Sequence, residues 1–141
     1  MRILDDLIAS LGDDVPTREV RIGPFWTAVW SRACGLASTV VPPKHEHGSA
    51  LVDNPGNLVA ASALDLAHLA FSERTLEAGI GLAAINSLLE VDEGRCVDLN
   101  AGRFLIEHGC SKRVALVGHF PFVPDLRAAG GEFYVVEQEP Q

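Results

Sequence analysis

The stretch of residues 113–123, Arg-Val-Ala-Leu-Val-Gly-His-Phe-Pro-Phe-Val, constrains the fold of this chain more than any other. Residues 114–117 are a short apolar run that ends at Gly118, which predicts a strand buried on both faces. A turn and a short helix over residues 125–129 follow, and residues 133–136 form a second apolar strand. Such strand, helix, strand units give parallel strands with a right-handed crossover.

Two polar residues come directly after these strands. In open parallel sheets, ligands bind just beyond the carboxyl ends of the strands, where His119 and Glu137 are expected. A neutral histidine nitrogen can bind a metal ion or relay a proton near neutral pH. His119 could equally bond to the backbone of its own loop, and Glu137 and Glu139 could be a solvated acidic terminus.

The distance in sequence from Gly118 to Glu137 resembles the spacing of dinucleotide-binding folds, in which an acidic residue binds the ribose. The glycine pattern of those folds is absent, because the loop after the strand has one glycine where Gly-x-Gly-x-x-Gly has three. Phe120 and Pro121 would also obstruct the close backbone approach of a pyrophosphate. We therefore expect no NAD.

Residues 42–57 are rich in proline, glycine and asparagine and predict a long loop that contains His45-Glu46-His47. Histidines two apart on an extended segment point to opposite sides, so His45 and His47 are weaker candidate metal ligands than His119. Their residue types suit zinc, nickel or copper. The alternative is an exposed polar loop.

The remainder of the chain predicts an α+β arrangement. The expected elements are a helix over residues 3–11, a three-stranded antiparallel meander over residues 18–41, and helices over residues 60–71, 73–90 and 101–108. Ser62 and Asp65 have the spacing of a capping box, and Ser72 is expected to cap the following helix.

Small and polar residues interrupt the apolar helix over residues 73–90. Gly79 and Gly81 each cost about 1 kcal/mol of helix propensity relative to alanine, which predicts a close approach by another element or a ligand. The amide of Asn86 needs a hydrogen-bonding partner in such surroundings. That partner could be backbone or a ligand.

Three segments together carry a family resemblance: residues 79–89, 118–123 and 136–140. The chain resembles the putative heavy-metal chelation family, whose members join an enolase-N-terminal-like domain to a Rossmann-like domain. The resemblance implies an α/β fold with an α+β domain over residues 1–110 and the first part of a Rossmann-like domain over residues 111–141.

The resemblance also implies a function. It indicates heavy-metal binding or chelation, with a divalent transition metal or a small metal-carrying molecule held in the crevice between the two regions. The implied binding residues are Asn86, Gly118, His119, Phe120 and Glu137, with His119 and Glu137 as metal ligands.

Two other functions remain open from the sequence. The chain could be an enzyme, or a relic of one, that binds a small anionic metabolite at the same crevice. Alternatively it could be an interaction module, because two parallel strands leave a sheet edge unpaired and a face uncovered. A chain cut short, a partner chain or self-association into a homo-oligomer would each explain that sheet.

Composition excludes some partners. The formal charge of −8 and the isoelectric point near 5.0 leave no basic field for nucleic acid. We expect no secretion signal and no membrane span. Cys34, Cys96 and Cys110 are widely spaced, which predicts reduced thiols, buried as small hydrophobic residues, in a cytoplasmic protein.

Overall fold

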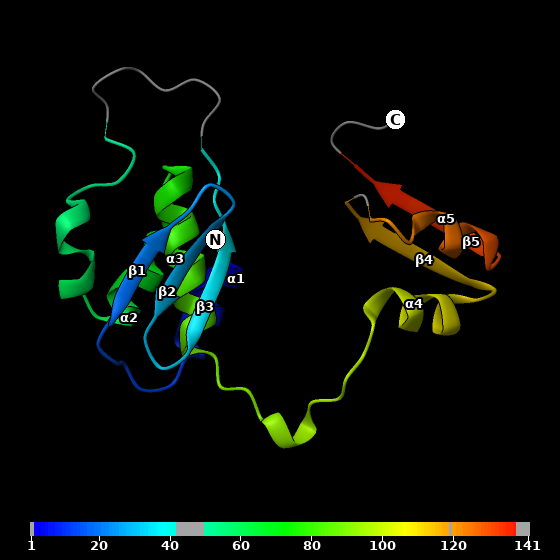
Figure 1. Ribbon diagram of the computed structural model, residues 1–141, viewed down its shortest axis with the longest axis horizontal. Coiled ribbons are helices and arrows are strands. Elements are labelled where there is room, and N and C mark those ends of the chain that lie inside the picture. The colour runs from blue at the N-terminus through cyan, green and yellow to red at the C-terminus, as the bar shows by residue number, and fades with distance from the viewer. Residues whose placement is uncertain (1, 42–49, 119, 138–141) are drawn as a thin grey trace. The chain divides into compact units, whose positions relative to one another are not determined.

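The computed structural model describes residues 2–41, 50–118 and 120–137. These form two compact units, Met1–Val91 and Asp92–Gln141, each described by itself below (Figure 1). The division lies before the boundary expected at residues 110 and 111, so the helix expected over residues 101–108 belongs to the second unit. The α/β class is confirmed, whereas the enolase-like and Rossmann-like labels of the two regions stay predictions.

The first unit contains a three-stranded antiparallel sheet in the order β1-β2-β3, which confirms the expected meander. Its strands are β1 (Glu19–Ile22), β2 (Trp26–Trp30) and β3 (Cys34–Ser38). Side chains of β2 alternate between the two faces, as the pleat of a strand requires. Thr27 and Val29 are buried on the inner face, whereas Trp26 and Trp30 lie on the outer face and are partly exposed.

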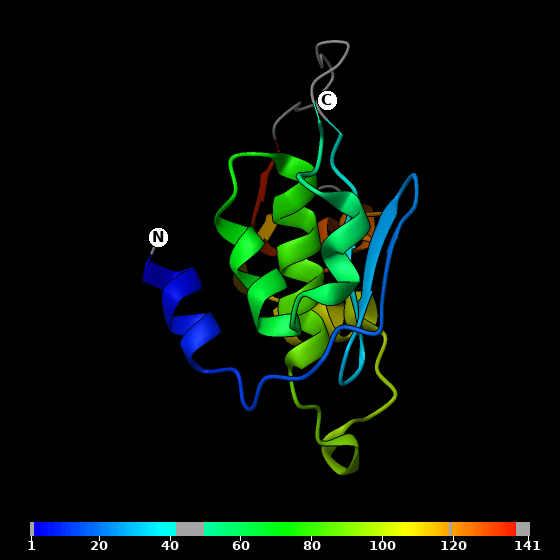
Figure 2. The ribbon, with the colours of Figure 1, turned by 90° about the vertical axis from the view of Figure 1, so that its left-hand side faces the viewer.

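Within the described part of this unit, helices cover only the inner face of the sheet. The unit contains α1 (Arg2–Ala9), α2 (Ala63–Ala67), α3 (Thr75–Leu88) and the 3-10 helices η1 (Pro55–Ala60) and η2 (His68–Phe71). In Figure 2 the strands lie along one side of α2 and α3. One side of helix α3 packs on β2 and β3, and its other side packs on α2 and η2. Most of its residues are therefore buried. Ile80, Ile85 and Leu88 are the largest fully buried aliphatic side chains of this helix.

The glycines permit this double packing. A Cβ atom at Gly81 would lie 2.0 Å from the backbone nitrogen of Ala70 in η2, and one at Gly35 would lie 2.0 Å from the carbonyl oxygen of Ala83. A Cβ at Gly79 would lie 3.3 Å from the carbonyl oxygen of Ser38. The close approach expected at Gly79 and Gly81 is confirmed, and other parts of the chain provide it.

The helix termini differ in how well they could be predicted. Helix α2 begins at the capping box of Ser62 and Asp65, as expected. The helix expected over residues 60–71 is divided, however, between η1, α2 and η2. The expectation that Ser72 caps α3 is wrong, because Arg74 is the N-cap residue. The Ser72 hydroxyl accepts from the Arg74 N–H at 3.1 Å and donates to Glu77.

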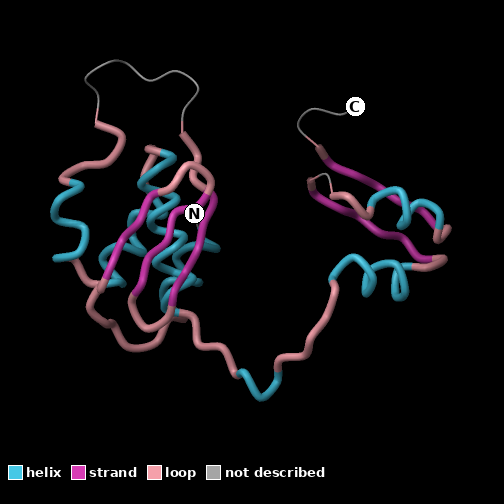
Figure 3. The backbone as a smooth tube through the Cα atoms, viewed as in Figure 1, coloured by secondary structure: helices cyan, strands magenta, loops and turns pink. Residues whose placement is uncertain are grey.

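The second unit pairs β4 (Lys112–Val117) with β5 (Gly131–Val136) in parallel, as the strand, helix, strand pattern predicts. Helix α5 (Val123–Ala128) connects them, and α4 (Ala101–Gly109) begins at the Asn100 cap. Figure 3 shows a loop with one short helix, η3 (Glu93–Arg95), before α4.

Strand β4 is not buried on both faces, which corrects the expectation from its apolar run. Val117, Tyr134 and Val136 are 78%, 57% and 60% exposed. The side chains of Val114 and Phe133, on the other face, are half-buried. Helices α4 and α5 pack on the two strands, and nothing in the described part of this unit covers the second face.

The cysteines also correct a prediction. Cys34, Cys96 and Cys110 are all exposed, although small hydrophobic residues of this kind were expected inside. Cys34 lies on the outer face of β3 opposite Trp30, and Cys110 is in the turn before β4. In the described part of the chain, no helix has both the length and the apolar character needed to cross a membrane.

Substituting Gly81 with alanine should lower the free energy of unfolding by about 1–3 kcal/mol or more, because the new methyl group meets backbone that cannot rotate away. Gly56→Ala in η1 is the matched control, since its Cβ would contact nothing within 4 Å. That control should be neutral or slightly stabilising. Chemical denaturation of both variants tests the expectation, and equal stabilities would contradict it.

Candidate functional site

The carboxyl edge of the β4–β5 sheet brings together residues that are distant in sequence. Val117 pairs with Val136, and the Gly118 N–H donates to the Val136 carbonyl oxygen at 2.9 Å. Gly118 has a φ of +96°, a conformation that side chains disfavour, so the chain can leave the strand sharply there. Glu137, which is exposed, follows Val136 at the same edge. The parallel register therefore places Gly118 and Glu137 on neighbouring strand ends.

The turn after β4 is held by aromatic contacts. Phe120, 40% exposed, stacks on Phe122 with ring centroids 5.3 Å apart. Phe122 in turn packs against α4 at Gly102, where a Cβ atom would lie 2.8 Å from the ring. The ring of Phe120 is thus a partly exposed apolar surface beside the end of β4.

Several predicted site residues lie outside the described residues: His119, Glu139, His45 and His47. Their roles stay predictions. Within residues 2–41, 50–118 and 120–137 there is no group of three or more His, Cys, Asp or Glu side chains that could hold a metal ion. The described residues alone therefore do not supply a complete donor set.

The first unit has an apolar groove of about 460 Å³ between α3 and the edge strand β3. Its lining residues are Ala37, Ser38, Val40, Thr75, Ala78, Gly79, Leu82 and Asn86. The five residues from α3 have helical spacing, so they form one stripe along the helix. Gly79, in the middle of the stripe, has no side chain to fill the groove.

Two polar side chains of α3 bind backbone at either end of this groove, one in β3 and one just beyond its end. Asn86 Nδ2 donates to the Leu36 carbonyl oxygen at 2.8 Å, and Thr75 Oγ1 donates to the Val40 carbonyl oxygen at 2.8 Å. The predicted need of Asn86 for a partner is therefore met by backbone. Among the described residues, no donor reaches its amide oxygen, which is the polar group that a molecule in the groove could use.

A buried carboxylate lies near the start of α3. Glu77 is only 6% exposed and accepts three hydrogen bonds: from Ser72 Oγ at 2.6 Å, from the Asp53 N–H at 2.8 Å and from Arg74 at 3.1 Å. Arg74 also pairs with the Asp53 carboxylate. This cluster ties Asp53 to the first turn of α3, which is a structural role.

The pKa of Glu77 reflects two opposed effects. Burial alone would raise the pKa, because it disfavours the charged form. The hydrogen bonds from Ser72, the Asp53 backbone and Arg74, with the positive charge of Arg74, outweigh burial and hold the pKa below its ordinary value. Glu77 is therefore ionised in the folded protein at neutral pH.

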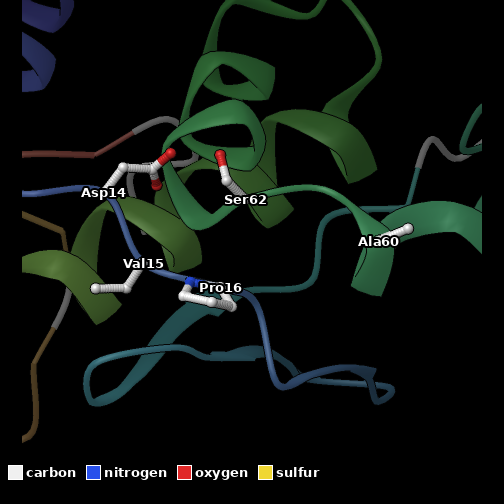
Figure 4. A pocket seen from close by; sticks show the side chains of 5 residues that line it. All are labelled: Asp14, Val15, Pro16, Ala60 and Ser62. Atoms are coloured by element: carbon white, nitrogen blue, oxygen red, sulfur yellow. The ribbon is translucent and has the colours of Figure 1, made fainter.

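A shallow hollow of about 350 Å³ lies beside α2, lined by Asp14, Val15, Pro16, Ala60 and Ser62 (Figure 4). Its polar groups already have partners. The Ser62 hydroxyl and the Leu64 N–H, at 3.0 Å, donate to the Asp14 carboxylate and lower its pKa despite some burial. These bonds serve the start of the short helix α2, so we assign the hollow no ligand.

Sequence reasoning missed Glu77 and the groove. The spacing of Arg74 and Glu77, three residues apart at a helix start, is a signal that could have identified the pair. No comparable signal marks Val40 or Leu82 as groove residues, because their proximity depends on how α3 lies along β3.

Comparison with known proteins gives a family. The model of the family described as "Putative heavy-metal chelation" matches residues 4–89, more than half of the chain. The chain therefore belongs to this family, as the sequence resemblance indicated. No curated protein is similar enough to count as a match.

Two solved structures share the fold. A protein with unknown function from the DUF364 family of Desulfitobacterium hafniense DCB-2 has 24% identity and a TM-score of 0.77, over 99% of this chain and 58% of that one. A DUF364 protein with unknown function from Pyrococcus horikoshii has 24% identity and a TM-score of 0.67, over 98% of this chain and 56% of that one. The chain thus spans less than three fifths of either protein.

The pH dependence of stability should report on Glu77. Because folding lowers its pKa, its contribution is complete above the ordinary glutamate pKa of about 4.5 and disappears as the pH falls through the lower folded value. Glu77→Gln should cost about 1–3 kcal/mol at neutral pH and less in acid. Thermal unfolding from pH 7 to pH 2 tests this, with the exposed neighbour Glu73→Gln as control. An unchanged acid profile in Glu77→Gln would contradict it.

Proposed function

We propose that this member of the heavy-metal chelation family binds a divalent transition metal ion, with His119 and Glu137 as its first ligands. The supporting observation is the parallel register of β4 and β5, which puts Gly118 and Glu137 on adjacent strand ends. His119 directly follows Gly118 in sequence. Loops at the carboxyl ends of parallel strands are the usual ligand sites of such sheets.

The chemistry of these donors suits a borderline metal. A neutral imidazole nitrogen and a carboxylate oxygen are common ligands of zinc, and they also bind cobalt and nickel. The net charge of −8 favours a cation over an anion. Metal binding by this pair would displace protons at low pH, so affinity should fall in acid.

Two donors do not complete a tetrahedral or octahedral site. The remaining positions would be filled by water or by a small molecule that carries the metal. The ring of Phe120 lies beside Gly118 and is partly exposed. It would therefore shield the strand end from water on that side.

A thermal-shift titration of the metal-stripped, reduced chain with zinc, nickel, copper, cobalt and iron tests the proposal. A metal at about 100 times its dissociation constant should add about 2.7 kcal/mol of stability, which is a shift of several degrees. His119→Ala and Glu137→Gln should each abolish most of that shift.

Matched controls separate a site from general binding by an acidic protein. Glu132→Gln changes a carboxylate at the other end of β5, and His108→Ala changes an exposed histidine in α4. Both variants should retain the full metal-induced shift. If no metal stabilises the wild type, or if the controls lose the shift together with the site variants, the proposal is wrong.

A second candidate function rests on the groove of the first unit. Its apolar stripe and the amide oxygen of Asn86 suit a small organic molecule with a hydrogen-bond donor at one end. This function differs from the metabolite-binding alternative raised by the sequence, which placed a small anionic metabolite in the crevice between the two regions. The groove lies within the first unit, and its lining residues include no cation to attract an anion.

A titration of labelled protein with indole, a neutral aromatic molecule with one N–H donor, followed by NMR, tests the groove. The amide signals of Gly79, Leu82 and Asn86 should shift together, and Leu82→Asp should suppress those shifts. Val59→Asp is the control, because Val59 is a similarly exposed aliphatic residue in η1. Shifts confined to other surfaces would exclude the groove as a binding site.

A further inference from the structure

The outer face of the three-stranded sheet is an apolar surface that nothing in the described part of the first unit covers. We define the tryptophan face by side chains that the register places on one side of the sheet: Glu19, Arg21, Trp26, Ala28, Trp30, Cys34, Leu36 and Ser38. Ala28 lies at its centre, directly between Arg21 and Leu36. The helices of the unit pack on the opposite side (Figure 2).

The exposed apolar area of this face is large for a monomer. Trp26, Trp30 and Leu36 are 59%, 48% and 49% exposed. From the area of such side chains, the exposed part amounts to roughly 300–400 Å², the size of the largest patch on a typical monomer, which is often functional. When the polar side chains at its margin, such as Glu19 and Arg21, are included, the exposed area of the face approaches the roughly 800 Å² that each partner contributes to a standard interface.

The shape of the face selects the kind of occupant. Of the grooves and hollows described above, only the groove beside α3 reaches this face, at Ser38 on its edge, so the centre of the face offers a small molecule no enclosure. A flat sheet face packs well on another sheet face, as in β-sandwiches, where two sheets stack about 10 Å apart. A second copy of this chain presents such a face with the same twist.

The charges also favour a second copy. Two chains of charge −8 repel each other across most of their surfaces. On the tryptophan face the single carboxylate, Glu19, is paired with Arg21 at 2.6 Å. Arg18 lies beside it, with its guanidinium carbon 5.9 Å from the centre of the Trp30 ring. Contact through this face therefore costs less electrostatic repulsion between two copies than contact through the rest of their negatively charged surfaces. In addition, Glu19 of one copy can pair with Arg21 of the other, and the reverse.

We propose that the tryptophan face is the interface of a homodimer, in which Trp26, Trp30 and Leu36 of two copies pack together around a two-fold axis. The tryptophan face lies within residues 4–89, the part of the chain that matches the family. This part is almost the whole of the first unit. The dimer is independent of the metal proposed above, whose candidate ligands are in the second unit.

The two tryptophans are the only ones in the chain, so fluorescence excited selectively in tryptophan, and not in Tyr134, reports on this face alone. We would measure molar mass by light scattering and tryptophan emission over a wide range of concentrations of the full chain. Wild type should have twice the chain mass of 15.1 kDa at high concentration, and its emission should shift to the red on dilution.

Leu36→Glu should weaken the dimer roughly a hundredfold or more, because it would bury a carboxylate without a partner. Ala28→Glu is a second variant with the same expectation, since both side chains point away from the core of the unit. Val59→Glu, on η1, should leave the mass unchanged. Circular dichroism confirms that each variant is folded.

Three outcomes would overturn the proposal. A single-chain mass with solvent-exposed emission at every concentration would mean that the face stays bare. A single-chain mass with blue-shifted, concentration-independent emission would mean that another part of the chain covers it. A dimer that survives both Leu36→Glu and Ala28→Glu would use a different surface.

Discussion

The first unit depends on the close contact of α3 with the chain on both of its sides. Gly35 lets β3 approach the helix from one side, and Gly81 lets η2 approach from the other. Between these contacts the helix buries Ile80, Ile85 and Leu88, which form the core with residues of the sheet and of α2. Because nearly all of α3 is enclosed, only one stripe of it faces outward, and that stripe forms the groove beside β3.

Much of the architecture could be predicted because local patterns and tertiary packing agree. The meander, the Ser62 capping box and the parallel β4–β5 pair follow from alternation, cap chemistry and the handedness of crossovers. Burial was predicted less well. An apolar run indicates a strand but does not tell how many faces are covered, and the exposed Val117 shows the difference. The exposed cysteines have the same cause, since hydrophobicity alone does not say which side of an element faces the core.

The candidate site was accessible from sequence only where it depends on topology. Gly118 and Glu137 could be placed at one edge because parallel strands end on the same side. Asn86 could be recognised as needing a partner, but its bond to Leu36 depends on the line that α3 takes along β3. The role of Ser72 depended in the same way on tertiary contact: it binds the buried Glu77 instead of capping α3, and Arg74 and the Asp53 backbone complete that cluster.

The glycine contacts have a consequence for how the sequence can diverge. In an ordinary core, a larger side chain at one position can be accommodated by a smaller one at a neighbouring position. At Gly35 and Gly81 the nearest atoms belong to the backbone of Ala83 and Ser87 and of Leu69 and Ala70, so no second substitution can make room. These two positions cannot co-vary with a partner. They should tolerate no residue but glycine while the surrounding sequence drifts, and so set the limit to divergence in this unit.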